Sequence, residues 1–125
     1  MLILSPSPDH KDARGVITDL LGKVDAVTEI TTCKGAVRGN HYHHDTTQWT
    51  YVVKGRLRVV TETLPGAPVE GVLRAGELME SPPGERHAWQ ALADTTVLVF
   101  TQGPRSGADY EKDVVRLEDE SRLIG

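Results

Sequence analysis

The residues best suited to chemistry are three histidines and a glutamine in two separate parts of the chain. His41 and His43 are two positions apart, Gln48 follows five positions later, and His87 comes directly after the turn-forming segment SPPGER. On a strand, residues at i and i+2 point to the same side and lie about 7 Å apart, close enough to share a metal ion. Gln48 could add a third ligand from an adjacent strand, while His44 would point to the opposite side. The alternative is a half-exposed strand that binds no metal.

Two neighbours of these histidines could bind a substrate. Arg38 lies three positions before His41, and its guanidinium suits an anionic group; it could also be a solvated arginine at a strand edge. If His87 faces inward, so does Trp89 by alternation, where it could form a pocket wall or simply fill the core. We assign substrate binding to Arg38 and Trp89 and leave the catalytic residues unassigned.

The elements that must position these residues are short strands. Runs rich in Val, Thr, Tyr and Trp alternate with glycine and proline, which predicts strands over residues 23–32, 47–53, 56–62, 87–93 and 95–101. Lys54-Gly55 joins two of them in a tight hairpin. The segment 108–125 could be a short helix or an extended tail that packs back on the body. We therefore expect one all-β domain over residues 1–125, a sandwich or a barrel.

Composition excludes several classes of protein. The net charge is −4, with no cluster of basic residues, which argues against binding to nucleic acid. The N-terminus MLILSPSPDH lacks the pattern of a signal peptide, and no apolar run approaches the roughly 20 residues that span a bilayer. A single cysteine, Cys33, cannot form an internal disulfide. We expect a cytoplasmic protein with a small-molecule partner and no membrane contact.

The spacing of glycines, histidines and proline resembles the cupin family. One block reads Gly35, five residues, His41-x-His43, four residues, Gln48, six residues, Gly55; the second reads Gly76, five residues, Pro82-x-Gly84, two residues, His87. The family motifs are G-(x)5-H-x-H-(x)3,4-E-(x)6-G and G-(x)5-P-x-G-(x)2-H-(x)3-N. Two positions differ, because Gln48 replaces a glutamate and Ala91 an asparagine. The resemblance implies a double-stranded β-helix, a jelly-roll barrel, with the site inside its mouth.

The resemblance also implies that His41, His43, Gln48 and His87 are the ligands of one divalent transition metal. An amide in place of the carboxylate leaves the site more positive and weakens one ligand, so the metal should be held less tightly and act as a stronger Lewis acid. Zn, Ni, Fe, Cu, Co and Mn all remain open. Some cupins work without metal, so an empty site is the alternative.

Function is predicted at the level of reaction class. We favour isomerase, epimerase or cyclase chemistry at a carbonyl, with a metal-dependent Fe or Cu dioxygenase and a non-catalytic ligand-binding or sensing cupin as alternatives. The RGxH stretch at Arg38 and the segment DARG at 12–15 are similar to sugar-nucleotide epimerases and 3,4-ketoisomerases. In those enzymes the arginine contacts the nucleotide diphosphate and the histidine is an acid/base group. Cupins commonly dimerise, so we expect a homodimer.

Overall fold

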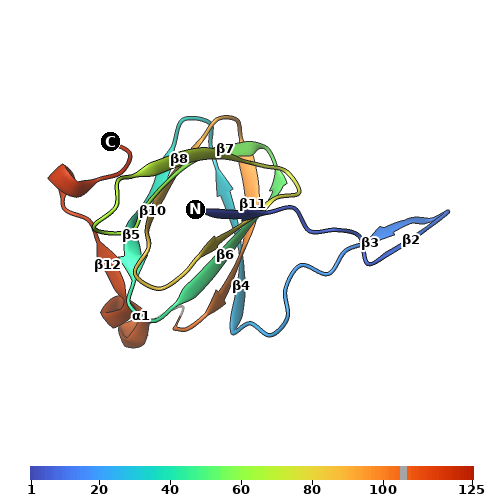
Figure 1. Cartoon of the computed structure of the whole chain (residues 1–125), viewed down its shortest axis with the longest axis horizontal. Coiled ribbons are helices and arrows are strands. Elements are labelled where there is room, and N and C mark those ends of the chain that lie inside the picture. Colours follow the sequence, from blue (N-terminus) through green and yellow to red (C-terminus); the bar gives the residue numbers. More distant parts are fainter. Residues whose placement is uncertain (105–106) are drawn as a thin grey trace.

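Two five-stranded antiparallel sheets face each other in the computed structural model, which describes residues 1–104 and 107–125. The first sheet has the order β1-β9-β6-β11-β4 and the second the order β12-β5-β10-β7-β8 (Figure 1). Their strands are β1 Leu2–Leu4, β4 Ala26–Thr32, β5 Val37–His43, β6 Thr47–Lys54, β7 Arg56–Glu62, β8 Val69–Arg74, β9 Leu78–Ser81, β10 Arg86–Ala91, β11 Thr95–Gln102 and β12 Val114–Arg116. The predicted jelly-roll architecture is confirmed.

The core lies between the two sheets because the strands alternate buried and less buried residues. In β6, Gln48, Thr50 and Val52 are buried while their neighbours are less so, as a strand with one covered face requires. Trp89 and Ala91 of β10 also face this core, as alternation from His87 predicts. The apolar cluster consists of Val52, Leu57, Val59, Leu73, Met79, Trp89, Ala91, Val97 and Val99.

Strands β8 and β9 were not predicted from the sequence. The sequence VEGVLR of β8 places Glu70 beside Gly71, so neither composition nor alternation favours a strand there. It forms because β8 pairs along its whole length with β7, so tertiary pairing decides the outcome. The short β9 is likewise held between β1 and β6.

The C-terminal segment combines both predicted alternatives. It begins with the helix α1 Gly107–Asp113, about two turns long, continues as β12, and passes through the 3-10 helix η1 Asp119–Ser121. The last residues then pack on the outer side of the second sheet, where Ile124 is buried with Val60 and Ala88. The segment is therefore a short helix followed by a tail that returns to the body.

A hairpin near the N-terminus stands away from the sandwich. Strands β2 His10–Asp12 and β3 Gly15–Ile17 pair only with each other, and Figure 1 shows them at the end of a long extension. We call residues 9–18 the N-terminal arm. Among the described residues, no helix is long and apolar enough to cross a bilayer; the cytoplasmic location stays a prediction.

Candidate functional site

Three histidines from two neighbouring strands meet inside the sandwich. His41 and His43 come from β5 and His87 from β10, and one ring nitrogen from each lies within 4.8 Å of the others. The ring centroid of His41 is 5.0 Å from that of His43 and 4.7 Å from that of His87. His44 is exposed on the other side, as predicted.

The histidines line a cavity of about 220 Å³ at the end of the sandwich where α1 lies. Its remaining wall comes from strands of both sheets and from α1. The lining residues are Ile30, Arg38, Gly39, His41, His43, Thr46, Gln48, His87, Trp89, Val99, Thr101, Pro104 and Tyr110. The structure therefore brings together all six residues predicted to bind metal or substrate, although their roles remain proposals.

A β-bulge explains how Arg38 and His41 reach the same cavity. Residues three apart on a regular strand point to opposite faces. Here His41 pairs with His87 and Gly39 pairs with Ala88, and the register shifts between them. The extra residue, Asn40, restores the inward direction for both side chains, as bulges beside functional sites commonly do.

His43 is held from behind by an aspartate of α1. Its Nδ1 lies 3.0 Å from Oδ2 of Asp113, and both side chains are almost fully buried. Burial alone would raise the pKa of Asp113, but hydrogen bonds from the Thr46 hydroxyl, the Asp45 backbone N–H and His43 outweigh it and hold the pKa below its ordinary value. The carboxylate accepts a hydrogen bond from the Nδ1–H group, and this tautomer of the neutral ring carries its lone pair on Nε2.

His87 stays neutral for a different reason. Burial, reinforced by the neighbouring His41 and His43 rings, lowers the pKa of His87 to about 3. Its Nδ1 lies 3.2 Å from the backbone oxygen of Glu85, which favours the tautomer with the lone pair on Nε2. No partner among the described residues hydrogen-bonds to that buried Nε2 atom. His87 thus offers an uncharged nitrogen lone pair to whatever enters the cavity.

Gln48 faces the histidines from the opposite sheet. It is 9% exposed, and its Nε2 lies 3.4 Å from Oγ1 of Thr50. An amide oriented this way directs its carbonyl oxygen away from Thr50, so it can serve as a neutral oxygen ligand or hydrogen-bond acceptor.

Arg38 and Trp89, which pair across β5 and β10, both form part of the cavity wall. The guanidinium of Arg38 crosses from β5 to β4, donating from Nε to Oγ1 of Thr32 and from Nη2 to the backbone oxygen of Thr31, both at 3.0 Å. Trp89 belongs to the apolar core, yet its buried Nε1 has no hydrogen-bond partner among the described residues. It therefore fills the core and also lines the cavity.

Asp113 and Tyr110 were missed by sequence reasoning. They lie 67 or more positions after His43 in the chain, in a segment without recognisable catalytic spacing, and α1 carries both to the cavity end. The Tyr110 ring centroid is 6.2 Å from that of His43. A signal existed only in the residue types, since nothing local indicates that this helix closes the barrel.

The residues present fit a divalent metal ion. Three imidazole nitrogens converge, the buried Nε2 of His87 lacks a partner among the described residues, and the Asp113 carboxylate behind His43 is the outer support that ligating histidines commonly have. His41, His43 and His87 would hold the ion, with Gln48 as a fourth neutral ligand.

Comparisons with known proteins place the fold. The model of the cupin family matches residues 20–108. The curated relative is a UDP-2-acetamido-2,6-beta-L-arabino-hexul-4-ose reductase from Pseudomonas aeruginosa, 34% identical over 85 residues; these are 64% of this chain but 23% of that protein. The chain thus spans about a quarter of the relative that it matches.

Solved structures resemble the whole chain at low identity. The dTDP-4-dehydrorhamnose 3,5-epimerase from Sulfolobus tokodaii is 22% identical, with a TM-score of 0.76 over 95% of this chain and 77% of that one. A mutant of a 3,4-ketoisomerase from Thermoanaerobacterium thermosaccharolyticum, solved with TDP-4-keto-6-deoxyglucose, is 17% identical, with a TM-score of 0.77 over 96% and 89%. Both are sugar-nucleotide enzymes that share the jelly-roll fold. With its motif spacing, its sandwich and the family match over most of its length, this chain belongs to the cupin family.

Proposed function

We propose that this cupin is an isomerase or epimerase that moves a proton beside the carbonyl of a nucleotide-linked sugar. The observation that carries the proposal is the buried pair of His43 and Asp113, 3.0 Å apart, at a cavity that Arg38 also lines. The names of the relatives support the substrate class, since the epimerase, the ketoisomerase and the hexulose reductase all act on nucleotide sugars.

In the proposed reaction His43 is the base. Its Nε2 takes the proton from the carbon next to the carbonyl, the C–H electron pair forms a carbon–carbon double bond, and the carbonyl π pair moves onto oxygen. Asp113 stabilises the imidazolium that forms. Return of a proton to the same carbon from the other side gives an epimer. When that carbon bears a hydroxyl, the enolate oxygen first takes a proton to give an enediol. The hydroxyl then loses its proton to become the new carbonyl, and the electron pair of the carbon–carbon double bond takes a proton at the former carbonyl carbon, so the carbonyl moves instead.

The other cavity residues bind and protonate. The guanidinium of Arg38 provides positive charge for a diphosphate group, and Trp89 offers an N–H and an apolar face to the sugar. Tyr110 and His41 line the same cavity, so either can deliver a proton to an oxygen or a carbon of the substrate. Walls of this composition, mainly apolar with a few polar groups, are typical of small-molecule sites.

As the alternative in which His43 is a ligand and not the base, we propose that the site takes one divalent transition metal on His41, His43, Gln48 and His87. A bound metal would supply Lewis-acid stabilisation of negative charge on a substrate oxygen. Elemental analysis of protein purified without added metal tests this assignment. Stoichiometric Zn, Ni, Co or Mn would agree with carbonyl chemistry, whereas stoichiometric Fe or Cu would favour the dioxygenase alternative. Metal-free protein would remove the ligand roles.

Proton exchange with solvent tests the reaction directly. We expect that incubation with TDP-4-keto-6-deoxyglucose, or its UDP-linked counterpart, in D₂O replaces a proton beside the carbonyl with deuterium, seen by ¹H NMR. His43→Asn should abolish the exchange, and Trp49→Phe is the matched control because Trp49 bonds Glu80 outside the cavity. If neither substrate exchanges a proton for deuterium, the proposal is contradicted and the ligand-binding alternative remains. A shift in the melting temperature of the protein with TDP would support that alternative.

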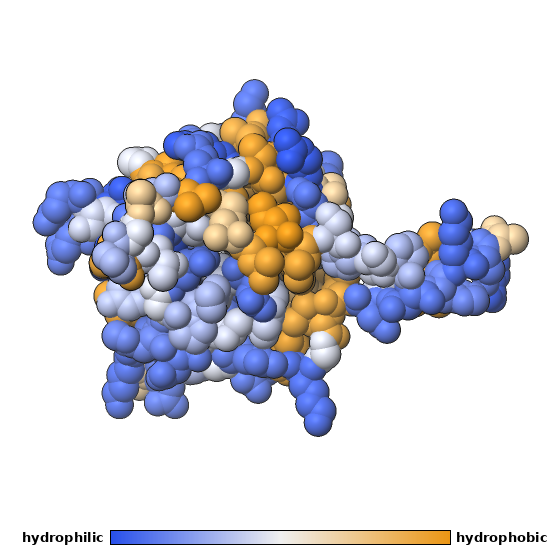
Figure 2. All heavy atoms as spheres, viewed as in Figure 1, coloured by the Kyte–Doolittle hydropathy of each residue, from blue (hydrophilic) through white to orange (hydrophobic). Residues whose placement is uncertain are grey.

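We infer further that the protein is a homodimer joined through its N-terminal arm. An isolated two-stranded hairpin is marginal in water, yet here it exposes Val16 at 52% and Ile17 at 60%. Leu2 and Leu4 of β1 are each 45% exposed, and Figure 2 shows apolar side chains gathered on the face that β1 crosses, beside the base of the arm. One chain thus offers both an arm that carries two exposed apolar residues and an apolar face, as a two-fold interface requires.

A further inference from the structure

One asparagine ties the C-terminal end of the chain to the strand that carries two of the histidines. Oδ1 of Asn40 accepts hydrogen bonds from the backbone N–H groups of Leu123 at 2.8 Å and Ile124 at 3.2 Å, and its Nδ2 donates to the Ile124 oxygen at 2.9 Å. Its backbone oxygen accepts from the Leu117 N–H at 2.9 Å. We call residues 117–124 the C-terminal strap. Both the side chain and the backbone of Asn40 are therefore bound by the strap.

Asn40 is also the extra residue of the β-bulge. It has φ of 58°, the only positive φ at a non-glycine position among the described residues. This left-handed conformation is disfavoured for most residues and tolerated by asparagine. Across the bulge, Ala88 pairs with Gly39 and His87 pairs with His41, so Asn40 has no partner in the register of β10. The strap supplies the hydrogen bonds that the sheet does not.

The strap itself is firmly seated. Ile124 is 5% exposed and packs with Val60 and Ala88 on the outer side of the second sheet, with Leu123 and Val37 beside it. Ala88 is the residue that pairs with Gly39 across the bulge. The strap therefore contacts both strands at the bulge: it hydrogen-bonds to Asn40 of β5 and packs against Ala88 of β10.

We infer that Asn40 is a positioning residue, through which the C-terminal strap holds the bulge that presents Arg38 and His41 to one cavity. On a regular strand these two side chains would lie on opposite faces. We call the contacts between Asn40 and the strap the clamp. Loss of the clamp would therefore let the side chain of Arg38 or of His41 leave the cavity, although both residues are still present. The ligand-binding half of this inference rests on the proposed function; the geometric half does not.

Two variants release the clamp in independent ways. Asn40→Ala removes all three side-chain hydrogen bonds, and Ile124→Asp expels the apolar anchor while leaving Asn40 intact. The matched control is Thr95→Val. Thr95 is as buried as Asn40, and its hydroxyl also lies within hydrogen-bond distance of three backbone groups, of Arg56 and Ala93. It lies outside the cavity, four residues or roughly 13 Å along β11 from the cavity residue Val99.

Histidine side-chain NMR reads the geometry without requiring any activity. In both clamp variants we expect the imidazole ¹⁵N signals of His41 and His87 to shift or broaden, while Thr95→Val leaves them as in the parent. Asn40→Asp, which keeps the acceptor for both N–H groups, should restore much of the parent spectrum. Calorimetric titration with TDP should show affinity about fivefold weaker or worse in the clamp variants, the effect of a misplaced charged hydrogen bond.

The outcomes separate the two proposals. Parent-like His41 and His87 signals in both folded clamp variants, or equal changes in Thr95→Val, would overturn the positioning role. If Asn40→Ala does not fold, Ile124→Asp and Asn40→Asp decide the question by the same spectra. Failure of the parent to bind TDP would count against the nucleotide-sugar function alone, because the imidazole signals still report whether the strap positions the site.

Discussion

In the proposed reaction Asp113 acts in catalysis and not in binding. It contacts His43 but is absent from the residues that line the cavity. We expect Asp113→Asn to lower the rate of deuterium exchange by about 100-fold or more, the usual weight of acid–base catalysis, because the amide would favour the wrong imidazole tautomer. The affinity for TDP should stay within about twofold of the parent. A large loss of TDP affinity with an unchanged exchange rate would contradict the assignment.

The proposed ligand role of Gln48 predicts that its side chain sets how tightly a metal is held. Replacing its amide with a carboxylate adds a negative charge beside three neutral imidazoles, so Gln48→Glu should raise the metal content of the purified protein and slow the removal of metal by a chelator. Elemental analysis of the two proteins, purified side by side, measures this effect. Gln90→Glu is the control, because Gln90 is outside the cavity and its Nε2 donates a hydrogen bond to the Gly35 oxygen. Unchanged metal content would remove Gln48 from the ligand set.

At the scale of elements, alternation predicted most of the site but not all of it. Period two correctly placed His41 with His43, and His87 with Trp89. The same rule would send Arg38 to the opposite face from His41. The bulge reverses that outcome, and its only local sign is the Gly39-Asn40 pair, since both residue types tolerate positive φ. Asp113 could not be found because a tertiary contact, not a spacing, brings α1 to His43.

Gly39 should therefore be more sensitive to substitution than a glycine of equal backbone conformation. Gly39 and Gly35 share a φ of 88°, but a Cβ at Gly39 would lie 2.8 Å from the His87 oxygen and 3.1 Å from Cα of Ala88, whereas one at Gly35 meets nothing within 4 Å. We expect Gly35→Ala to cost about 1 kcal/mol of unfolding free energy and Gly39→Ala about 2–4 kcal/mol. Urea denaturation measures both. Equal losses would mean that the bulge can separate from β10 freely.

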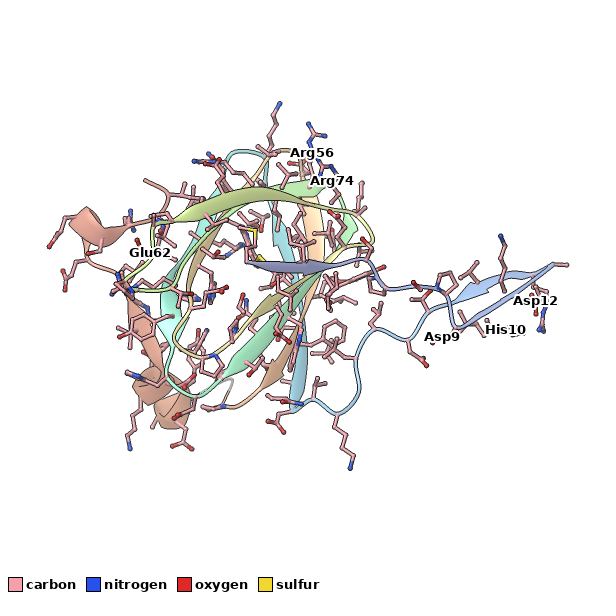
Figure 3. The ribbon with its side chains drawn as sticks, in the orientation of Figure 1. Asp9, His10, Asp12, Arg56, Glu62 and Arg74 are labelled. Carbon is pink, nitrogen blue, oxygen red and sulfur yellow. The ribbon has the colours of Figure 1, made fainter. Side chains whose placement is uncertain are left out.

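For the whole molecule, the sequence predicted the jelly roll but not how its ends are used. Short strands and turn spacing predicted a sandwich or a barrel, because each sheet must bury one face, and the resemblance to the cupin motifs narrowed this to a jelly roll. The arm is a hairpin of two three-residue strands, and the strap is held by tertiary hydrogen bonds to Asn40. Neither segment has a strong local sequence pattern. Figure 3 shows Asp9, His10 and Asp12 on the arm, far from Arg56 and Arg74 at the other end of the sandwich from α1. The two proposals give each terminal segment a role beyond the barrel: the strap positions the site, and the arm joins a second copy.

The arm gives the dimer its clearest test. Light scattering coupled to gel filtration should report twice the chain mass of 13.7 kDa for the parent. Val16→Asp with Ile17→Asp should shift the protein toward the monomer, because charged groups on the arm would have to be desolvated at the interface. Leu64→Asp is the control, since Leu64 is 58% exposed but lies in the turn after β7, away from the arm. A monomeric parent protein would contradict the homodimer. An arm variant that remains dimeric would show that the arm does not join the two copies.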